Sequence, residues 1–261
     1  MEFVNGMPKT LFKYRDYDNE YNRKSLFNFE LYFPSANRLN DPYEGAIPFR
    51  YNPDELTQEN IFLKQYYVCK NENPDWDEEQ IHEFCYNNKD NIFDPENLEK
   101  LDELNRATVI RDFGILSLTD DPMNYLMWSY YAKSHTGFCI GYDTVQLFNT
   151  SKATLSQVGY TDKIPKHSLD EEIAVFHQKQ LSTKGKFWAH ESEYRLIRMK
   201  GANSSLKIDP KIISHIYFGC NMKENIRFEI IDFAKKHLDH ANIYELSLDQ
   251  SFFKLNDSKI F

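Results

Sequence analysis

Three short segments of the chain each carry two polar side chains of one kind, separated by a single residue. These pairs are Lys13 and Arg15 in KYR, Ser117 and Thr119 in SLT, and Glu191 and Glu193 in ESE. In a β-strand, residues two apart project from the same face, so each pair is expected to point in one direction. If the three faces meet in one cleft, that cleft combines two cations, two hydroxyls and two carboxylates.

Such a cleft suits an anionic ligand that carries ribose. A guanidinium such as that of Arg15 binds phosphate through a planar fork of N–H donors. Hydroxyls bind amides or ribose, and a carboxylate can bind a sugar hydroxyl and stabilise a developing oxocarbenium ion. Charges with this spacing also occur on strands that face solvent, so the pairs by themselves leave a purely structural interpretation open.

The segment NDPYE adds three candidates, Asn40, Asp41 and Glu44. These side chains could position a ribose or hold a loop against a ligand. Alternatively, Asn-Asp-Pro forms a turn in which a side chain caps the following backbone. The sequence favours neither interpretation over the other.

The segment MWSYYAKSH predicts a helix with Trp128, Tyr131 and His135 on one face. An aromatic stripe at this spacing is more typical of a hydrophobic core than of a ligand platform. In either case, buried polar groups of Tyr131 and His135 would need hydrogen-bond partners.

Alternating and continuous apolar segments predict the strands that would position these residues. The expected strands are 11–15, 30–35, 113–119, 137–143, 153–160, 191–199, 212–219, 242–248 and 251–256. Helical spacing of apolar residues predicts helices at 19–29, 124–133, 168–181 and 223–238. We therefore expect one α+β domain, 1–261, with a mixed or antiparallel sheet.

Residues 52–112 interrupt this pattern and predict a helical insertion, because Pro53, Pro74 and Pro95 each stand near an expected helix start. Between 71 and 104 the insertion is strongly acidic. An acidic run of this kind is either a solvated helix face or a docking surface for a basic partner.

The whole chain is also acidic, with 31 Lys and Arg against 40 Asp and Glu and a net charge of −9. This balance disfavours binding to nucleic acid or to an anionic membrane through overall charge.

The absence of G-x-G-x-x-G and G-x-x-x-x-G-K-[ST] segments disfavours a Rossmann site and a P-loop. The four cysteines form no C-x-x-C pair, and there is neither a signal pattern nor an 18-residue apolar run. We therefore expect a cytoplasmic protein with reduced thiols and no zinc site.

Three blocks together resemble one family: NDPYE (40–44), LMWSYYAKSHTGF (126–138) and WAHESEYR (188–195). On these blocks, and on their order along residues 11–221, the chain resembles the uncharacterised bacterial family catalogued as domain of unknown function 2971. The layout of that family is similar to ADP-ribosyltransferase folds, which implies a split sheet. In this comparison KYR corresponds to the early-strand cation, SLT to the middle hydroxyl strand and ESE to the strand with the catalytic Glu.

The resemblance implies an enzyme that binds NAD as a substrate and transfers ADP-ribose to a macromolecule, either protein or nucleic acid. The residues expected to bind NAD are Lys13, Tyr14, Arg15, Asn40, Asp41, Ser117 and Trp128. Among them, Tyr14 or Trp128 would stack on a ring of the ligand. The expected catalytic residues are Glu193, which would stabilise the ribosyl cation and orient or deprotonate the acceptor, Glu191, which would place the acceptor, and Arg15. The gene context of the family is similar to that of toxin and phage-defence systems, which implies an effector with a neutralising partner protein.

Two other functions are left open by the sequence. The protein could be a non-enzymatic sensing or adaptor module whose acidic insertion binds a basic partner. It could also be a metal-dependent nuclease that uses Asp41, Glu44, Glu191 and Glu193. A pocket shared by Arg15 and Glu193 favours the transferase, whereas carboxylates grouped within metal-binding distance favour the nuclease.

Overall fold

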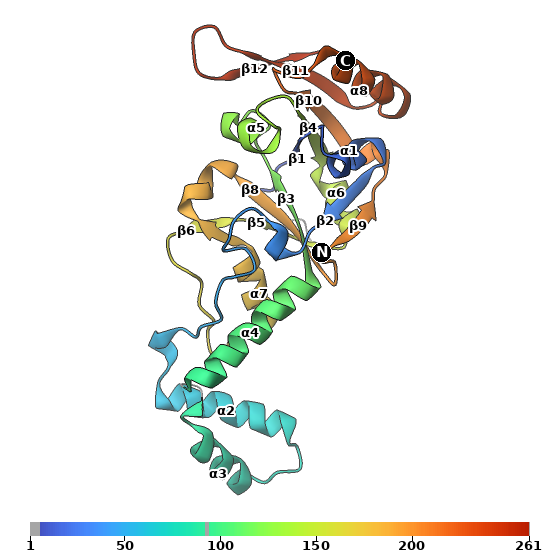
Figure 1. Ribbon diagram of the computed structural model, residues 1–261. Helices are drawn as coiled ribbons and strands as arrows, with labels where there is room; N and C mark the ends of the chain where they lie inside the picture. Colours follow the sequence, from blue (N-terminus) through green and yellow to red (C-terminus); the bar gives the residue numbers. More distant parts are fainter. Residues whose placement is uncertain (1–5, 92–93, 261) are drawn as a thin grey trace.

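The computed structural model describes residues 6–91 and 94–260. Its centre is an eight-stranded sheet with the strand order β12-β11-β10-β4-β1-β3-β8-β5 (Figure 1). These strands are β1 (Thr10–Arg15), β3 (Phe113–Thr119), β4 (Phe138–Asp143), β5 (Thr154–Gln157), β8 (Glu193–Met199), β10 (Ile213–Phe218), β11 (Asn242–Leu248) and β12 (Leu255–Lys259). Neighbouring strands are antiparallel except β10 and β11, which are parallel. The predicted α+β class and mixed sheet are thus confirmed.

Two small sheets and several helices surround the central sheet. β2 (Glu30–Phe33) pairs with β9 (Ser204–Lys207), and β6 (Gly159–Thr161) pairs with β7 (Thr183–Gly185). The α-helices are α1 (Glu20–Phe27), α2 (Gln58–Glu72), α3 (Glu78–Asn88), α4 (Pro95–Asp112), α5 (Tyr125–Tyr131), α6 (Thr144–Ser151), α7 (Ile173–Leu181) and α8 (Glu224–His237). Short 3-10 helices include η1 (Ala36–Arg38), η2 (Pro53–Glu55), η4 (Lys186–Glu191) and η5 (Pro210–Ile212).

The central sheet is divided between β1 and β3. β1 pairs with β4 along its whole length, and β3 pairs in the same way with β8. Between β1 and β3 the register holds a single pair, Phe12 opposite Thr119. Beyond this pair the two strands diverge, so the sheet consists of a β12-β11-β10-β4-β1 half and a β3-β8-β5 half.

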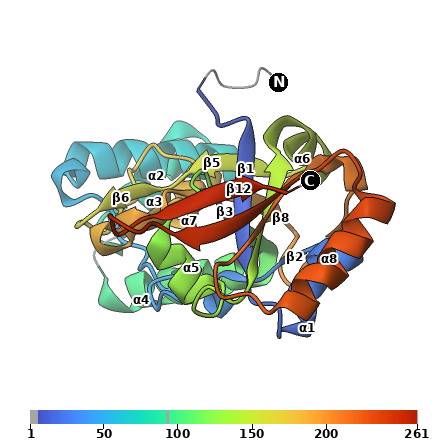
Figure 2. The same ribbon diagram turned by 90° about the horizontal axis from the view of Figure 1, so that it is seen from above.

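One face of the sheet packs on α1, α6 and α8, whose buried residues join the largest hydrophobic cluster. Figure 2 shows α1 and α8 side by side, and the Phe27 and Phe233 rings make an edge contact there with centroids 4.9 Å apart. α5 packs on the other face, where Trp128 is fully buried and meets the Tyr14 ring edge-on. His135 lies beyond the end of α5 and still stacks on Trp128, with the rings inclined by 16°.

Side-chain caps explain where the helices next to the sheet begin. The Asn124 side chain accepts a hydrogen bond from the Met127 backbone N–H and caps α5. Its amide group also donates to the His190 carbonyl at 2.5 Å. The same residue therefore starts α5 and holds this helix against η4, directly before β8.

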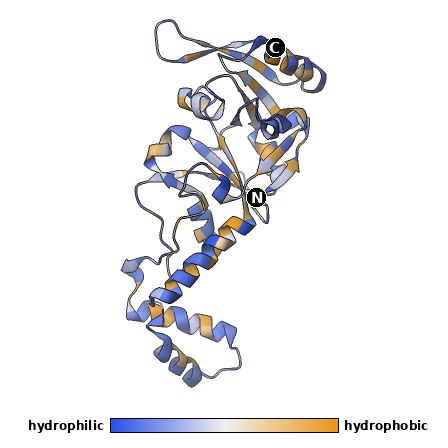
Figure 3. Ribbon diagram, viewed as in Figure 1, coloured by the Kyte–Doolittle hydropathy of each residue, from blue (hydrophilic) through white to orange (hydrophobic). Residues whose placement is uncertain are grey.

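α2 and α3 form a helical extension that α4 connects to β3 (Figure 1). A small cluster of Cys69, Ile81 and Cys85 packs α2 against α3. Asp77 and Gln80 form a reciprocal capping box at the start of α3. Figure 3 shows mainly hydrophilic residues on these two helices, in agreement with their polar sequences. These helices occupy the residues for which the sequence predicts a helical insertion.

Several predicted boundaries need correction. Residues 153–160 do not form one strand: β5 pairs with β8, whereas β6 pairs with β7 in a separate sheet. The last strand begins only at Leu255, because 250–254 form a bend. Glu191 is the last residue of η4 and is not on a strand, since Ser192 adopts a left-handed conformation with φ of 44° and β8 starts at Glu193. The helix expected at 168–181 begins at Ile173.

All four cysteines are free thiols, and Cys69, Cys85 and Cys139 are buried, as predicted for a reduced protein. Within 6–91 and 94–260, no helix is both long and apolar enough to cross a lipid bilayer.

Gly137, immediately before β4, allows the backbone to approach the end of β1. A Cβ at this position would lie 2.1 Å from the Arg15 carbonyl oxygen. We expect Gly137→Ala to displace Arg15 and to lower the free energy of unfolding by about 1–3 kcal/mol in urea denaturation. Gly159→Ala is the matched control, because its nearest neighbour would be 3.8 Å away, and a change within about 0.5 kcal/mol is expected. Equal effects of the two substitutions would contradict this interpretation.

Candidate functional site

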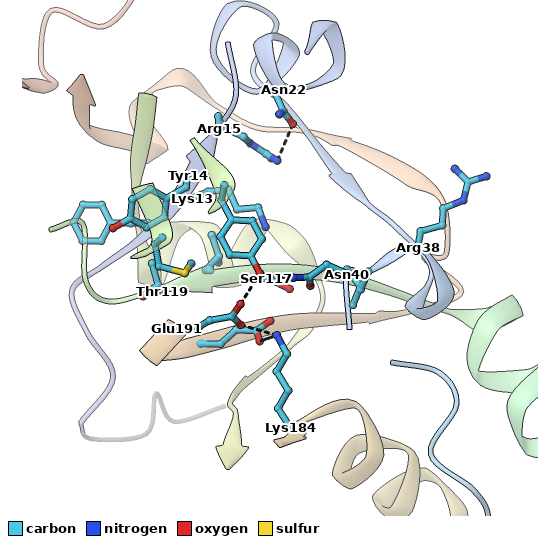
Figure 4. A pocket seen from close by; sticks show the side chains of 16 residues that line it. Lys13, Tyr14, Arg15, Asn22, Arg38, Asn40, Ser117, Thr119, Lys184 and Glu191 are labelled. Carbon is cyan, nitrogen blue, oxygen red and sulfur yellow. Dashed lines mark hydrogen bonds and ion pairs between the residues drawn. The ribbon is translucent and has the colours of Figure 1, made fainter. Parts of the chain in front are cut away.

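A cavity of about 280 Å³ lies between the diverging strands β1 and β3 (Figure 4). Its lining includes all three polar pairs found in the sequence: Lys13 and Arg15, Ser117 and Thr119, and Glu191 and Glu193. β1 contributes the cations, β3 the hydroxyls, and η4 with β8 the carboxylates. The tertiary structure therefore brings together segments that are far apart in the chain.

The cations enter the cavity without a counter-charge. Arg15 donates from Nη1 to the Asn22 side-chain oxygen at 3.3 Å, and among the described residues its buried Nε has no partner. Neither Lys13 nor Arg15 has a carboxylate within ion-pair distance in that part of the chain. Burial, and then the charge of Arg15, lower the pKa of Lys13 to about 7. Burial also lowers the pKa of Arg15. An anionic ligand would supply the missing negative charge.

Glu193 has the opposite environment, because its carboxylate is held by several donors. Oε1 accepts from Nε of Arg195 at 2.8 Å, and Oε2 accepts from Nη2 of Arg195 at 3.1 Å and from Lys184 at 3.2 Å. Burial opposes ionisation of Glu193. The Arg195 charge and hydrogen bonds, followed by Lys184 and the Ser117 hydroxyl, outweigh this effect and lower the pKa of Glu193 to about 2. Glu193 is therefore a fixed anion at neutral pH.

Glu191 is connected to both walls of the cavity. Its Oε2 accepts from Lys184 at 2.6 Å, and its Oε1 accepts from the Tyr131 hydroxyl at 2.5 Å. The Asn40 amide donates to the Tyr131 oxygen at 2.5 Å (Figure 4). Burial and the hydrogen bond to Glu191 raise the pKa of Tyr131, so its phenol stays protonated. Asn40 and Tyr131 thus link the NDPYE turn and α5 to the Glu191 carboxylate.

A buried ion network lies behind the carboxylates. Arg195 is fully buried and donates to the Leu181 carbonyl at 2.7 Å and to both oxygens of Glu44, with Nη1 2.9 Å from Oε2. Lys184 lies 3.9 Å from Glu44 and contacts both other glutamates of the network. Sequence reasoning did not select Arg195 or Lys184. Strand spacing could have identified Arg195, because it is two residues after Glu193 and therefore shares its strand face. The sequence around Lys184 does not indicate that this lysine reaches the glutamates.

Three residues expected to bind NAD are placed differently. Trp128 does not line the cavity and is fully buried, with its indole N–H donating to a backbone carbonyl at 2.9 Å. Tyr14 borders the cavity, but the residue is only 4% exposed and its hydroxyl donates to the Asp121 carbonyl. Neither ring has a free face for stacking. Asp41 is buried outside the cavity and accepts from the Tyr43 backbone N–H at 3.0 Å, as a turn-forming residue does.

The carboxylates are not arranged as metal ligands. Glu44, Glu191 and Glu193 surround the cations of Lys184 and Arg195. Across the described ranges, no group of three or more His, Cys, Asp or Glu side chains could hold a metal ion. The nuclease alternative therefore has no ligand set there. α2, α3 and α4 contribute no residue to the cavity lining, so the acidic extension is separate from this site.

Comparison with known proteins adds one relationship. The profile of the family described as protein of unknown function (DUF2971) matches residues 127–196. This match supports the DUF2971 family for residues 127–196. The matched segment contains Lys184, Glu191, Glu193 and Arg195, and therefore most of the buried ion network. No curated protein and no solved structure matches the chain.

The low pKa of Glu193 predicts a loss of stability at acid pH. The folded pKa of about 2 lies below the ordinary value of 4.5, so the stabilisation is complete above pH 4.5 and is lost as the pH falls towards 2. Over this interval, we expect the free energy of unfolding to fall by about 3 kcal/mol more in the wild type than in Glu193→Gln, as measured by urea denaturation. Glu99→Gln, at an exposed position on α4, should keep the wild-type profile. Identical profiles for the wild type and Glu193→Gln would contradict the prediction.

Proposed function

We propose that this protein is an ADP-ribosyltransferase that binds NAD between β1 and β3 and transfers ADP-ribose to a macromolecular acceptor. The observation that carries this proposal is the shared cavity of Arg15 and Glu193, in which unpaired cations and a fixed carboxylate occur together. NAD has a matching distribution of charge, since its pyrophosphate is anionic and its ribose becomes cationic when the nicotinamide leaves.

Lys13 and Arg15 would bind the pyrophosphate. Both project from the same face of β1, and neither is neutralised by a carboxylate in the described part of the chain. The unpaired Nε of Arg15 belongs to a planar fork that matches two phosphate oxygens. Burial makes the charged forms of Lys13 and Arg15 unfavourable, and a bound anion would offset this cost.

Glu193 would stabilise the transition state. When the bond between the ribose C1′ and the nicotinamide nitrogen breaks, its electron pair leaves with nicotinamide and positive charge develops on the ribose. A carboxylate that is already ionised and held by Arg195 stabilises this charge without reorganisation. The acceptor nucleophile then bonds to C1′, and its proton passes to solvent water. Because the pKa of Glu193 is about 2, Glu193 acts through its charge and not as the base, and Glu191 places the acceptor.

A neighbouring cavity enlarges the site. It has a volume of about 420 Å³ and shares Asn40 and Tyr131 with the first cavity. Tyr130, Phe187 and Trp188 also line it. Aromatic rings of this kind stack on planar heterocycles, so we assign ring stacking to this second cavity in place of Tyr14 and Trp128.

The proposal also includes a cytoplasmic toxin or phage-defence role with a neutralising partner protein, which is supported by the family resemblance.

Incubation with NAD labelled in its adenylate half, together with a cell lysate, tests the proposal. We expect the wild type to release nicotinamide and to label protein or nucleic acid, and Glu193→Gln to be slower by about 100-fold or more. Glu44→Gln is the matched control, because it removes another partner of Arg195 but does not line the cavity. It should lose stability while retaining activity at temperatures where it stays folded. A wild type without nicotinamide release, or equal activity of the two variants, would overturn the proposal.

Substitution of Glu191 should affect transfer to the acceptor separately from the hydrolysis of NAD. We expect Glu191→Gln to reduce transfer to the macromolecule by about 100-fold while NAD hydrolysis continues, because Glu193 keeps its Arg195 contacts. The ratio of transferred label to released nicotinamide measures this difference. Tyr131→Phe, which removes the hydroxyl bound to Glu191, should shift the ratio in the same direction. A proportional fall in both reactions would argue against an acceptor role for Glu191.

A further inference from the structure

Two lysines line the same cavity but differ in their pairing. Lys184 lies 2.6 Å from Glu191, 3.2 Å from Glu193 and 3.9 Å from Glu44, so its ammonium group is occupied by these carboxylates. Lys13 has no hydrogen bond or ion pair in the described part of the chain, and its nearest charged neighbour on the strand is Arg15. Figure 4 shows Lys13 and Arg15 entering from one side of the cavity and Lys184 and Glu191 from the other.

We infer that Lys13 is a carbonyl-reactive amine, and that the cavity takes a phosphorylated aldehyde as a covalent ligand bound to Lys13 as an imine. This inference does not depend on NAD as a substrate. It rests on an unpaired amine inside a cavity, a guanidinium beside it for the phosphate, and the separation of this amine from the carboxylates that hold Lys184.

The surroundings of Lys13 favour the neutral amine, which is the nucleophilic form. Burial acts most strongly, followed by the like charge of Arg15 on β1, and Lys184 on β7 acts in the same direction. The opposing groups are Glu193 on β8 and Glu191 at the end of η4, which favour the charged form. The balance is a pKa of about 7, so about half of the amine is neutral at pH 7.

Imine formation needs no oxidant or reductant. The lone pair of Nζ attacks the carbonyl carbon and forms the C–N bond. The C–O bond of the adduct then breaks, and the oxygen leaves as water with the two protons that the amine has lost. The product is a neutral C=N bond between Lys13 and the ligand.

The phosphate on the proposed ligand would be bound by the guanidinium of Arg15. Arg15 is two residues from Lys13 on the same strand face, a separation of about 7 Å between backbone positions. A short aldehyde with a phosphate a few bonds from its carbonyl can therefore reach both groups. The unpaired Nε of Arg15 and its single amide partner, Asn22, leave donors free for the phosphate.

The test uses pyridoxal 5′-phosphate as the probe and borohydride to reduce any imine, followed by peptide mass spectrometry. We expect the label on Lys13 and not on Lys184, with half-maximal labelling near pH 7. Exposed lysines such as Lys152, which lie outside the cavity, should be labelled more slowly than Lys13. Lys13→Arg keeps the charge but cannot form an imine, so it should lose this label while its thermal unfolding stays close to that of the wild type.

A second arm tests the phosphate. We expect the wild type to be labelled at least 10-fold faster by pyridoxal 5′-phosphate than by pyridoxal, and Arg15→Gln to lose this preference. Labelling spread over surface lysines without an excess at Lys13, equal labelling of Lys184, or a preference unchanged in Arg15→Gln would overturn the inference. The assay involves no NAD turnover, so its failure and the failure of nicotinamide release are separate results.

Discussion

The guanidinium of Arg195 lies in the protein interior with no exposed surface, and its charge must be neutralised there. Transferring an ion from water to such a position costs several kcal/mol, and only close, well-oriented partners offset this cost. Glu44 and Glu193 are these partners, and the Leu181 carbonyl accepts a further hydrogen bond. The requirement holds the NDPYE turn, the end of α7 and the start of β8 at one point. The carboxylate wall of the cavity depends on this contact.

The same contact explains why the two sides of the cavity remain separate. Glu193 already accepts hydrogen bonds from Arg195 and Lys184, and Glu191 accepts from Lys184 and Tyr131. The negative charge is therefore compensated by Arg195 and Lys184 and not by the cations on β1. Within the described residues, Lys13 and Arg15 on β1 have no carboxylate partner, and the divergence of β1 from β3 provides space between the two sides. A site that binds a ligand with both anionic and electrophilic parts needs this kind of separation.

The sequence predicted several parts of this arrangement for a clear physical reason. Side chains two apart on a strand share a face, so KYR and SLT were assigned correctly to β1 and β3. The same rule was wrong for Glu191, because the left-handed Ser192 ends η4 and interrupts the strand, although both glutamates still line the cavity. Trp128 was ambiguous, since an aromatic on an amphipathic helix can face a core or a ligand, and packing against Tyr14 placed it in the core.

Local spacing and residue chemistry thus predicted, from the chain alone, the α+β class and the cationic and hydroxyl pairs. They could not indicate which strands would be neighbours, because a register between β1 and β3 depends on packing between residues more than 100 positions apart. The partnership of Lys184 and Arg195 with three glutamates emerges only in the folded protein, where loss of water makes each buried charge depend on its neighbours. Whether a lysine is occupied, like Lys184, or unpaired, like Lys13, is a property of that environment and not of the residue.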